Sequence, residues 1–83
     1  MPVDQLNVFI QSPRGRKPFA FEKTEKVAEV IEKARTAFGF EPGAFVLKRE
    51  KTGEALDAQR PLVSYKIEDD EVLILVPEMG SGV

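Results

Sequence analysis

The sequence predicts an α+β fold in which one β-sheet packs on one helix. Apolar residues alternate with polar ones between residues 6 and 10, which is typical of a half-buried strand. Between residues 27 and 38 they recur at three- and four-residue spacing, which indicates an amphipathic helix. A continuous apolar run, "VLILV", fills residues 72–76 and favours a central strand. A chain of 83 residues forms one domain, and covering one sheet face with one helix buries all three patterns together.

The first strand is expected to turn back on itself as an N-terminal hairpin. In "SPRG", at residues 12–15, proline presets a turn and Gly15 tolerates a positive φ. The returning segment "KPFAFEK" places Phe19 and Phe21 on one face of the sheet. We therefore predict two antiparallel strands joined by a tight turn.

The helix that follows has recognisable start and stop signals. Thr24 is expected to be its N-cap, with Glu25 in the first turn, where the helix dipole favours an acid. Gly39 is expected to end it, and "EPG" at residues 41–43 prevents it from resuming.

The rest of the chain is expected to complete the sheet. It contains a strand "AFVLKRE" at residues 44–50, a turn around "KTG", a short strand "EAL" at 54–56, a loop with Arg60 and Pro61, and the final strand. The predicted core comprises Leu6, Val8, Ile10, Phe19, Phe21, Val27, Val30, Ala34, Leu47, Leu56, Ile67, Leu73 and Leu75.

The amino-acid composition limits the classes of function that the chain can perform. Cysteine and histidine are both absent, so the chain lacks a thiolate nucleophile, the usual zinc ligands and the side chain best suited to proton transfer near neutral pH. We therefore expect neither an enzyme nor a bound cofactor. The 12 basic and 14 acidic residues are interspersed and give a charge of −2, which favours protein partners over nucleic acid or membrane. No apolar run spans a bilayer and the first residues do not resemble a signal peptide, so we expect a cytoplasmic protein.

The element order and the last 30 residues resemble those of ubiquitin. The segment that starts at Gly53 contains "LVSYKI" at residues 62–67, which keeps an L-x-x-Y-x-I pattern, followed by the apolar strand and glycines. The resemblance implies a ubiquitin-like β-grasp fold, a mixed sheet packed on one helix, over residues 1–77, with a flexible tail at 78–83. It also implies that the Tyr65 hydroxyl bonds to a nearby backbone group, as a buried phenol requires.

Carried to the end without gaps, the resemblance places Gly82 on the terminal glycine of mature ubiquitin. It implies a protein modifier: a peptidase removes Val83, and the Gly82 carboxylate is then activated and joined to target proteins by an isopeptide bond. Activation needs an extended tail with almost no side chains, which Gly80, Ser81 and Gly82 nearly provide. The implied partners are activating and conjugating enzymes, a deconjugating peptidase and the targets.

Two residues depart from ubiquitin. Ser81 replaces a glycine, and Glu78 replaces an arginine that the ubiquitin-activating enzyme reads. This combination resembles the ubiquitin-like modifiers encoded in bacterial conjugation operons more than it resembles eukaryotic ubiquitin. The lysines that ubiquitin uses most for chains fall on Glu54 and Asp69, so the familiar linkages are absent.

Partner binding is expected on the sheet face opposite the helix. Phe9, Ile74 and Val76 should project from this face, because the neighbouring positions in their strands are assigned to the core. Lys48 falls where the family has the central isoleucine of this face, so readers of ubiquitin should bind poorly. Together with Glu78, these four residues form the predicted partner-binding set.

The sequence is also compatible with other interpretations of the chain, its tail and its basic residues. The chain could be a non-covalent ubiquitin-like binding module, like those associated with bacterial secretion, or a sulfur carrier with a terminal thiocarboxylate. The tail could be an ordinary disordered end, or "SGV" could be a ligand for a carboxylate-capturing domain. Arg14, Arg16 and Lys17 could hold a phosphate or an acidic partner, or could form a solvated loop.

Overall fold

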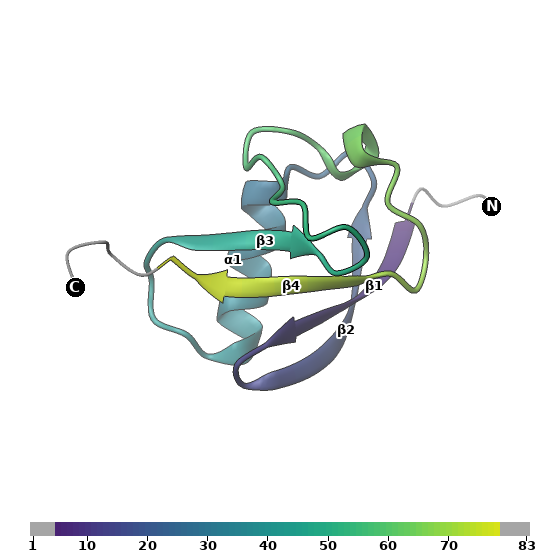
Figure 1. Ribbon diagram of the computed structural model, residues 1–83. Coiled ribbons are helices and arrows are strands. Elements are labelled where there is room, and N and C mark those ends of the chain that lie inside the picture. The colour runs from purple at the N-terminus through teal and green to yellow at the C-terminus, as the bar shows by residue number, and fades with distance from the viewer. Residues whose placement is uncertain (1–4, 79–83) are drawn as a thin grey trace.

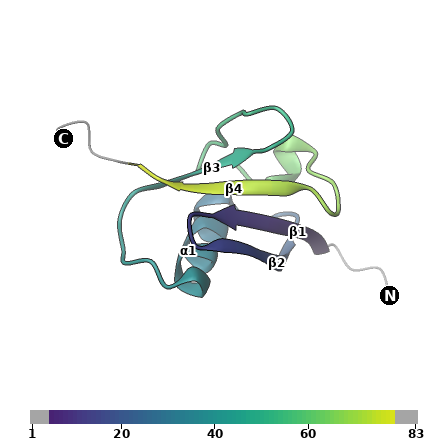
Figure 2. The same ribbon diagram turned by 60° about the horizontal axis from the view of Figure 1, so that its bottom comes forward.

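The computed structural model describes residues 5–78 and shows a mixed sheet packed on one helix, as predicted; the sheet has four strands (Figure 1). The elements are β1 (Gln5–Ser12), β2 (Gly15–Glu22), α1 (Val27–Phe38), β3 (Phe45–Arg49), the 3-10 helix η1 (Leu62–Tyr65) and β4 (Val72–Pro77). The strand order is β2-β1-β4-β3, with β1 and β4 parallel and the other pairs antiparallel. Figure 2 shows α1 lying across one face of the sheet.

The final apolar run forms the central strand β4, which confirms its prediction. Leu73 and Leu75 are completely buried. Leu73 pairs with Ile10 of β1 on one side and with Arg49 of β3 on the other. The last strand of the sequence therefore holds the two halves of the sheet together.

The core contains every predicted residue except Phe19, which is half-buried. Phe19 lies on the edge strand β2, where its ring packs against Phe21 and Phe38 with centroids 5.5 and 6.0 Å apart but stays partly open to solvent. The core also includes residues that the predicted set omitted: Ile31, Phe38 and Leu62.

The N-terminal hairpin is confirmed, with Ser12 paired to Gly15 across the turn. Gly15 has a φ of 119°, which explains the glycine at this position. The buried Ser12 hydroxyl accepts a hydrogen bond from the Arg14 N–H and donates one to the Gly15 carbonyl. Backbone and side chain together close the turn.

The start of α1 differs from the prediction, because its N-cap is Lys26 rather than Thr24. The chain stays extended through Lys26, which pairs with Pro61 as an isolated bridge. The N–H group of Val27 donates to the Arg60 carbonyl at 2.9 Å, so a distant loop satisfies a donor that a capping side chain would otherwise bind. Gly39 ends the helix with a φ of 78°, as predicted.

Residues 50–71 contain one wrong prediction and one omission. The "EAL" segment is not a strand: Ala55 makes a single bridge to Lys48, and the Leu56 N–H donates to the Leu47 carbonyl. Further along, the expected loop contains the 3-10 helix η1, which buries Leu62 completely. Within residues 5–78, no helix is both long and apolar enough to cross a membrane.

Candidate protein-binding site

The sheet face opposite α1, called the outer face here, carries the candidate site. Strand residues alternate between the two faces, so the neighbours of the buried positions in β1 and β4 project outward. The apolar residues of the outer face are Phe9, Pro18, Val46, Val72, Ile74 and Val76. All except the exposed Pro18 are half-buried.

Strand register places the predicted site residues of β3 and β4 together. Ile74 lies opposite Lys48, and Val76 lies opposite Val46. Directly opposed side chains in antiparallel strands are close enough to touch, so the Lys48 stem lies beside apolar neighbours. Within residues 5–78, no carboxylate lies within 4.0 Å of the Lys48 ammonium. Lys48 thus places a cation beside the apolar side chains of Ile74 and Val46 on the outer face.

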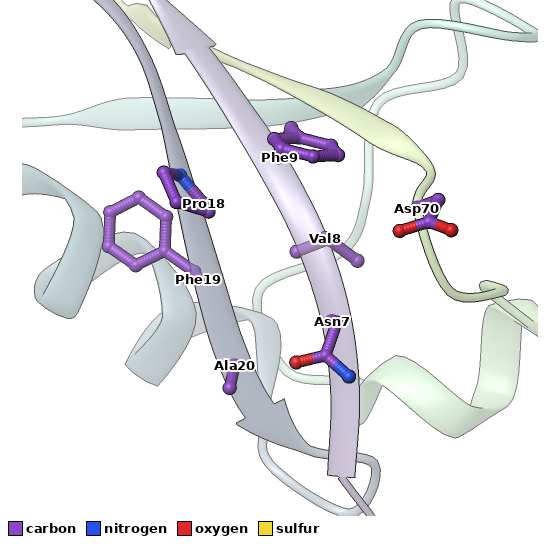
Figure 3. A pocket seen from close by; sticks show the side chains of 7 residues that line it. All are labelled: Asn7, Val8, Phe9, Pro18, Phe19, Ala20 and Asp70. Carbon is purple, nitrogen blue, oxygen red and sulfur yellow. The ribbon is translucent and has the colours of Figure 1, made fainter.

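Phe9 lies beside a shallow depression of about 260 Å³ on the same face. Asn7 and Phe9 of β1, together with Pro18 and Ala20 of β2, line it on adjacent strands, with Asp70 beyond β1 (Figure 3). The small side chain of Ala20 leaves the hollow open. Because Phe9 is also in register with Val72, the depression adjoins the apolar surface of β4.

Glu78 marks the point where the chain leaves the sheet. Its N–H group donates to the Ala44 carbonyl at 2.9 Å, while its side chain is exposed. The preceding residue, Pro77, pairs with Phe45 at the edge strand. The predicted conjugation, processing and tail residues lie outside the described residues: Gly80, Ser81, Gly82 and Val83.

Tyr65 occupies the position that the resemblance implies. Its hydroxyl accepts a hydrogen bond of 2.7 Å from the backbone N–H of Asp57, and its ring packs against the core. This contact confirms the prediction and fixes the loop that leads into η1.

The basic hairpin tip has a structural role that the sequence did not indicate. The Arg14 guanidinium donates to the carbonyls of Phe38 and Gly39 at 3.1 and 2.9 Å and lies 4.6 Å from the Phe40 ring centroid. A cation at this position satisfies orphan carbonyls at the negative end of the helix dipole. Arg14 therefore caps the C-terminal end of α1, although the residue is exposed.

An ion pair that the sequence did not reveal anchors the loop before β4. Arg49 Nε and Nη2 donate to the two carboxylate oxygens of Glu71 at 3.0 and 2.6 Å. The Glu68 N–H donates to the same carboxylate. Hydrogen bonding from Arg49 lowers the pKa of Glu71, although burial opposes the shift. The ion pair and the Glu68 hydrogen bond together fix residues 68–71 to β3.

Comparisons with known proteins agree with this fold. No protein-family model matches the chain. It is 30% identical over 82 residues to the nuclear protein localization protein 4 homolog of human and of mouse, covering 95% of this chain. The solved ubiquitin-like domain of an Arabidopsis thaliana protein superposes with a TM-score of 0.80 at 19% identity, covering 94% of this chain and 82% of that one. A de novo design based on ubiquitin superposes with a TM-score of 0.79 at 21% identity, covering 96% and 98%.

The topology and the structural neighbours together show that the chain has the ubiquitin-like β-grasp fold. The chain spans only 14% of the length of the curated relatives it matches.

Proposed function

We propose that this ubiquitin-like domain acts by binding other proteins through its outer face. The observation that carries the proposal is the contiguous apolar surface of β1, β3 and β4 around the exposed Lys48. Scattered surface apolar residues are ordinary, whereas a continuous group with a polar rim is typical of a contact surface. Phe9, Ile74 and Val76 would provide the apolar contacts, and Lys48 and Glu78 the polar ones.

The test replaces Ile74 with serine, which removes apolar area near the middle of the outer face. Ile74 is half-buried and its neighbours Leu73 and Leu75 hold the strand, so the fold should persist, as an amide NMR spectrum would verify. Ala37→Ser, on the exposed side of α1, is the matched control. We expect proteins captured from the source cells to be retained by Ala37→Ser and lost with Ile74→Ser. Equal retention by both variants would remove the proposal.

The more specific function that we propose is covalent modification of other proteins through Gly82. Its support is the spacing between the fold and the tail: β4 ends at Pro77, and Gly82 follows five residues later with Gly80 and Ser81 before it. Small residues let such a tail extend into a narrow enzyme channel. Activating and conjugating enzymes and a deconjugating peptidase would supply all the catalysis, in the cytoplasm, as in bacterial conjugation operons.

Conjugation leaves a remnant that the sequence makes easy to find. Glu78 is the last acidic residue, so a protease that cuts after glutamate leaves Met-Gly-Ser-Gly, residues 79–82, on the modified lysine. We expect this remnant in proteins that co-purify with the N-terminally tagged chain under denaturing conditions. Gly82→Val should abolish it, because a β-branched residue crowds the carbon that must react. Efficient conjugation of chains that still carry Val83 would contradict the assignment to Gly82.

A second candidate is a non-covalent binding domain inside a larger protein. The curated relatives favour it, because the similar region is 14% of their length and thus one segment of a longer chain. This candidate uses the same outer face but no tail chemistry. Partner binding that is lost with Ile74→Ser and unchanged by Gly82→Val, with no remnant on any lysine, would select it.

A further inference from the structure

We propose that a second surface of this domain, separate from the outer face and from Gly82, binds an acidic segment of a partner protein. This surface, called the basic patch, consists of the exposed side chains of Lys23, Lys26, Arg60 and Lys66 around Val63. It lies on the β2–α1 loop and η1, at the end of the molecule away from the point where β4 finishes (Figure 1).

Backbone hydrogen bonds hold the two segments of the basic patch together. The Val63 N–H donates to the Lys23 carbonyl at 2.9 Å, and the Leu62 N–H donates to the Glu25 carbonyl at 3.0 Å. The Arg60 carbonyl accepts a hydrogen bond of 2.9 Å from the Val27 N–H. Leu62 is completely buried and anchors the contact. The cations are therefore brought together by a rigid junction rather than by two independent loops.

Within the two segments of the patch, residues 23–26 and 60–66, the one carboxylate is that of Glu25, and it is already paired. Glu25 lies 2.6 Å from the Lys33 ammonium, and its side chain is 8% exposed. The Asp57 carboxylate accepts a hydrogen bond from the Gln59 N–H. Across residues 5–78, none of the four patch cations has an ion-pair partner within 4.0 Å. Outside the patch the chain has eight basic and 14 acidic residues, so the patch is a positive area on an acidic molecule.

Val63 adds an apolar contact at the centre of the basic patch. It is 52% exposed and is the only large apolar residue so exposed in the described part of the chain. Its carbonyl accepts a hydrogen bond from the Lys66 N–H, and its own N–H donates to the Lys23 carbonyl, so its backbone lies beside those of two patch residues. Lys66 has a φ of 53°, a conformation that is uncommon for lysine and that turns the chain sharply after η1. An apolar centre ringed by cations complements an acidic peptide with one apolar side chain.

Charge and composition favour a protein segment over a nucleic acid or a membrane. The chain as a whole carries a charge of −2, which repels an extended polyanion beyond the local contact. No aromatic ring of the patch is available for base stacking, because the nearby Tyr65 packs on the core and its hydroxyl is bonded to Asp57.

The test is an NMR titration of the isotope-labelled chain with a synthetic nine-residue peptide of Glu and Asp with one central leucine. We expect saturable shifts of the Lys23, Val63 and Lys66 amides. A peptide with Gln and Asn in place of the acids should not bind. The variant Lys23→Glu/Arg60→Glu should bind the acidic peptide at least about tenfold more weakly. Within residues 5–78 both residues make backbone hydrogen bonds and neither side chain has an ion-pair partner, so the fold should persist. Val63→Ser should also weaken binding, because the leucine loses its apolar contact.

The matched control is Arg16→Glu/Lys17→Glu, which makes the same change in net charge at the exposed hairpin tip. Affinity close to that of the unaltered chain supports the proposal. Equal weakening by the two double variants would show that net charge alone attracts the peptide and would overturn it. Tighter binding of a ten-nucleotide oligo(dT), or of phosphatidylserine vesicles, than of the peptide would overturn the choice of a protein partner. Loss of binding with Ile74→Ser would place the contact on the outer face and also refute the patch.

Discussion

Replacing Leu73 with alanine should remove a large fraction of the stability of this domain. The side chain is completely buried in β4 between β1 and β3. Losing three buried carbons costs about 2.4 kcal/mol at roughly 0.8 kcal/mol each, and the residual cavity raises the loss to about 3–4 kcal/mol. A domain of 83 residues has a free energy of unfolding of about 4–12 kcal/mol.

The assays are urea unfolding and thermal unfolding, both followed by far-ultraviolet circular dichroism, since the chain has no tryptophan and one tyrosine. The melting temperature should fall by at least about 12 °C, at roughly 4 °C or more per kcal/mol for this size. Ile74→Ala is the matched control, because it changes the next residue on the half-exposed face and should cost about 1 kcal/mol. If the two variants lost the same stability, β4 would not divide its side chains between core and outer face as described.

Three further perturbations test individual contacts by urea unfolding. Tyr65→Phe removes the acceptor for the Asp57 N–H and should lower the free energy of unfolding by about 1 kcal/mol, and no change would show that water replaces the hydroxyl. The pKa of Glu71 is lowered in the folded state, so its pairing with Arg49 stabilises the fold above the unfolded pKa and is lost as the pH falls through the folded pKa. Glu71→Gln should therefore reduce stability at pH 7 and flatten its decline below about pH 5, whereas an unchanged acid profile would contradict this. Arg14→Ala should cost about 1 kcal/mol by freeing the carbonyls at the end of α1, and an unchanged urea midpoint would show that the contact adds no stability.

Local patterns were sufficient for the sheet and the helix, but not for contacts made by distant loops. Period-two alternation and the apolar final run predict β1 and β4, because buried residues alternate with more exposed ones along β1 and through residues 72–76 of β4. Thr24 is not the N-cap, because Lys26 is still extended and the first helical N–H is that of Val27. This N–H donates to the carbonyl of Arg60, 33 positions after Val27. Nothing in the sequence around Thr24 encodes that contact.

For the candidate site, too, local patterns predicted the strand residues but not the contacts between distant segments. Strand alternation placed Phe9, Ile74 and Val76 on the outer face, and register adds Val46 and Val72, which lie across from them. The first leucine of the L-x-x-Y-x-I pattern could have identified Leu62 as core, since it is completely buried in η1. The Arg14 cap and the Arg49–Glu71 pair could not be predicted, because both join segments more than 20 residues apart through side chains.

The central claim is that partners cover the outer face, and site-specific photocrosslinking in the source cells tests it most directly. A benzophenone amino acid placed at position 48 lies in the middle of this face, and the same residue at position 37 lies on the exposed side of α1. We predict discrete crosslinked species from position 48 that disappear when Ile74→Ser is added, and none of these species from position 37. Crosslinks of equal yield and identity from both positions, or species from position 48 that persist with Ile74→Ser, would contradict the account.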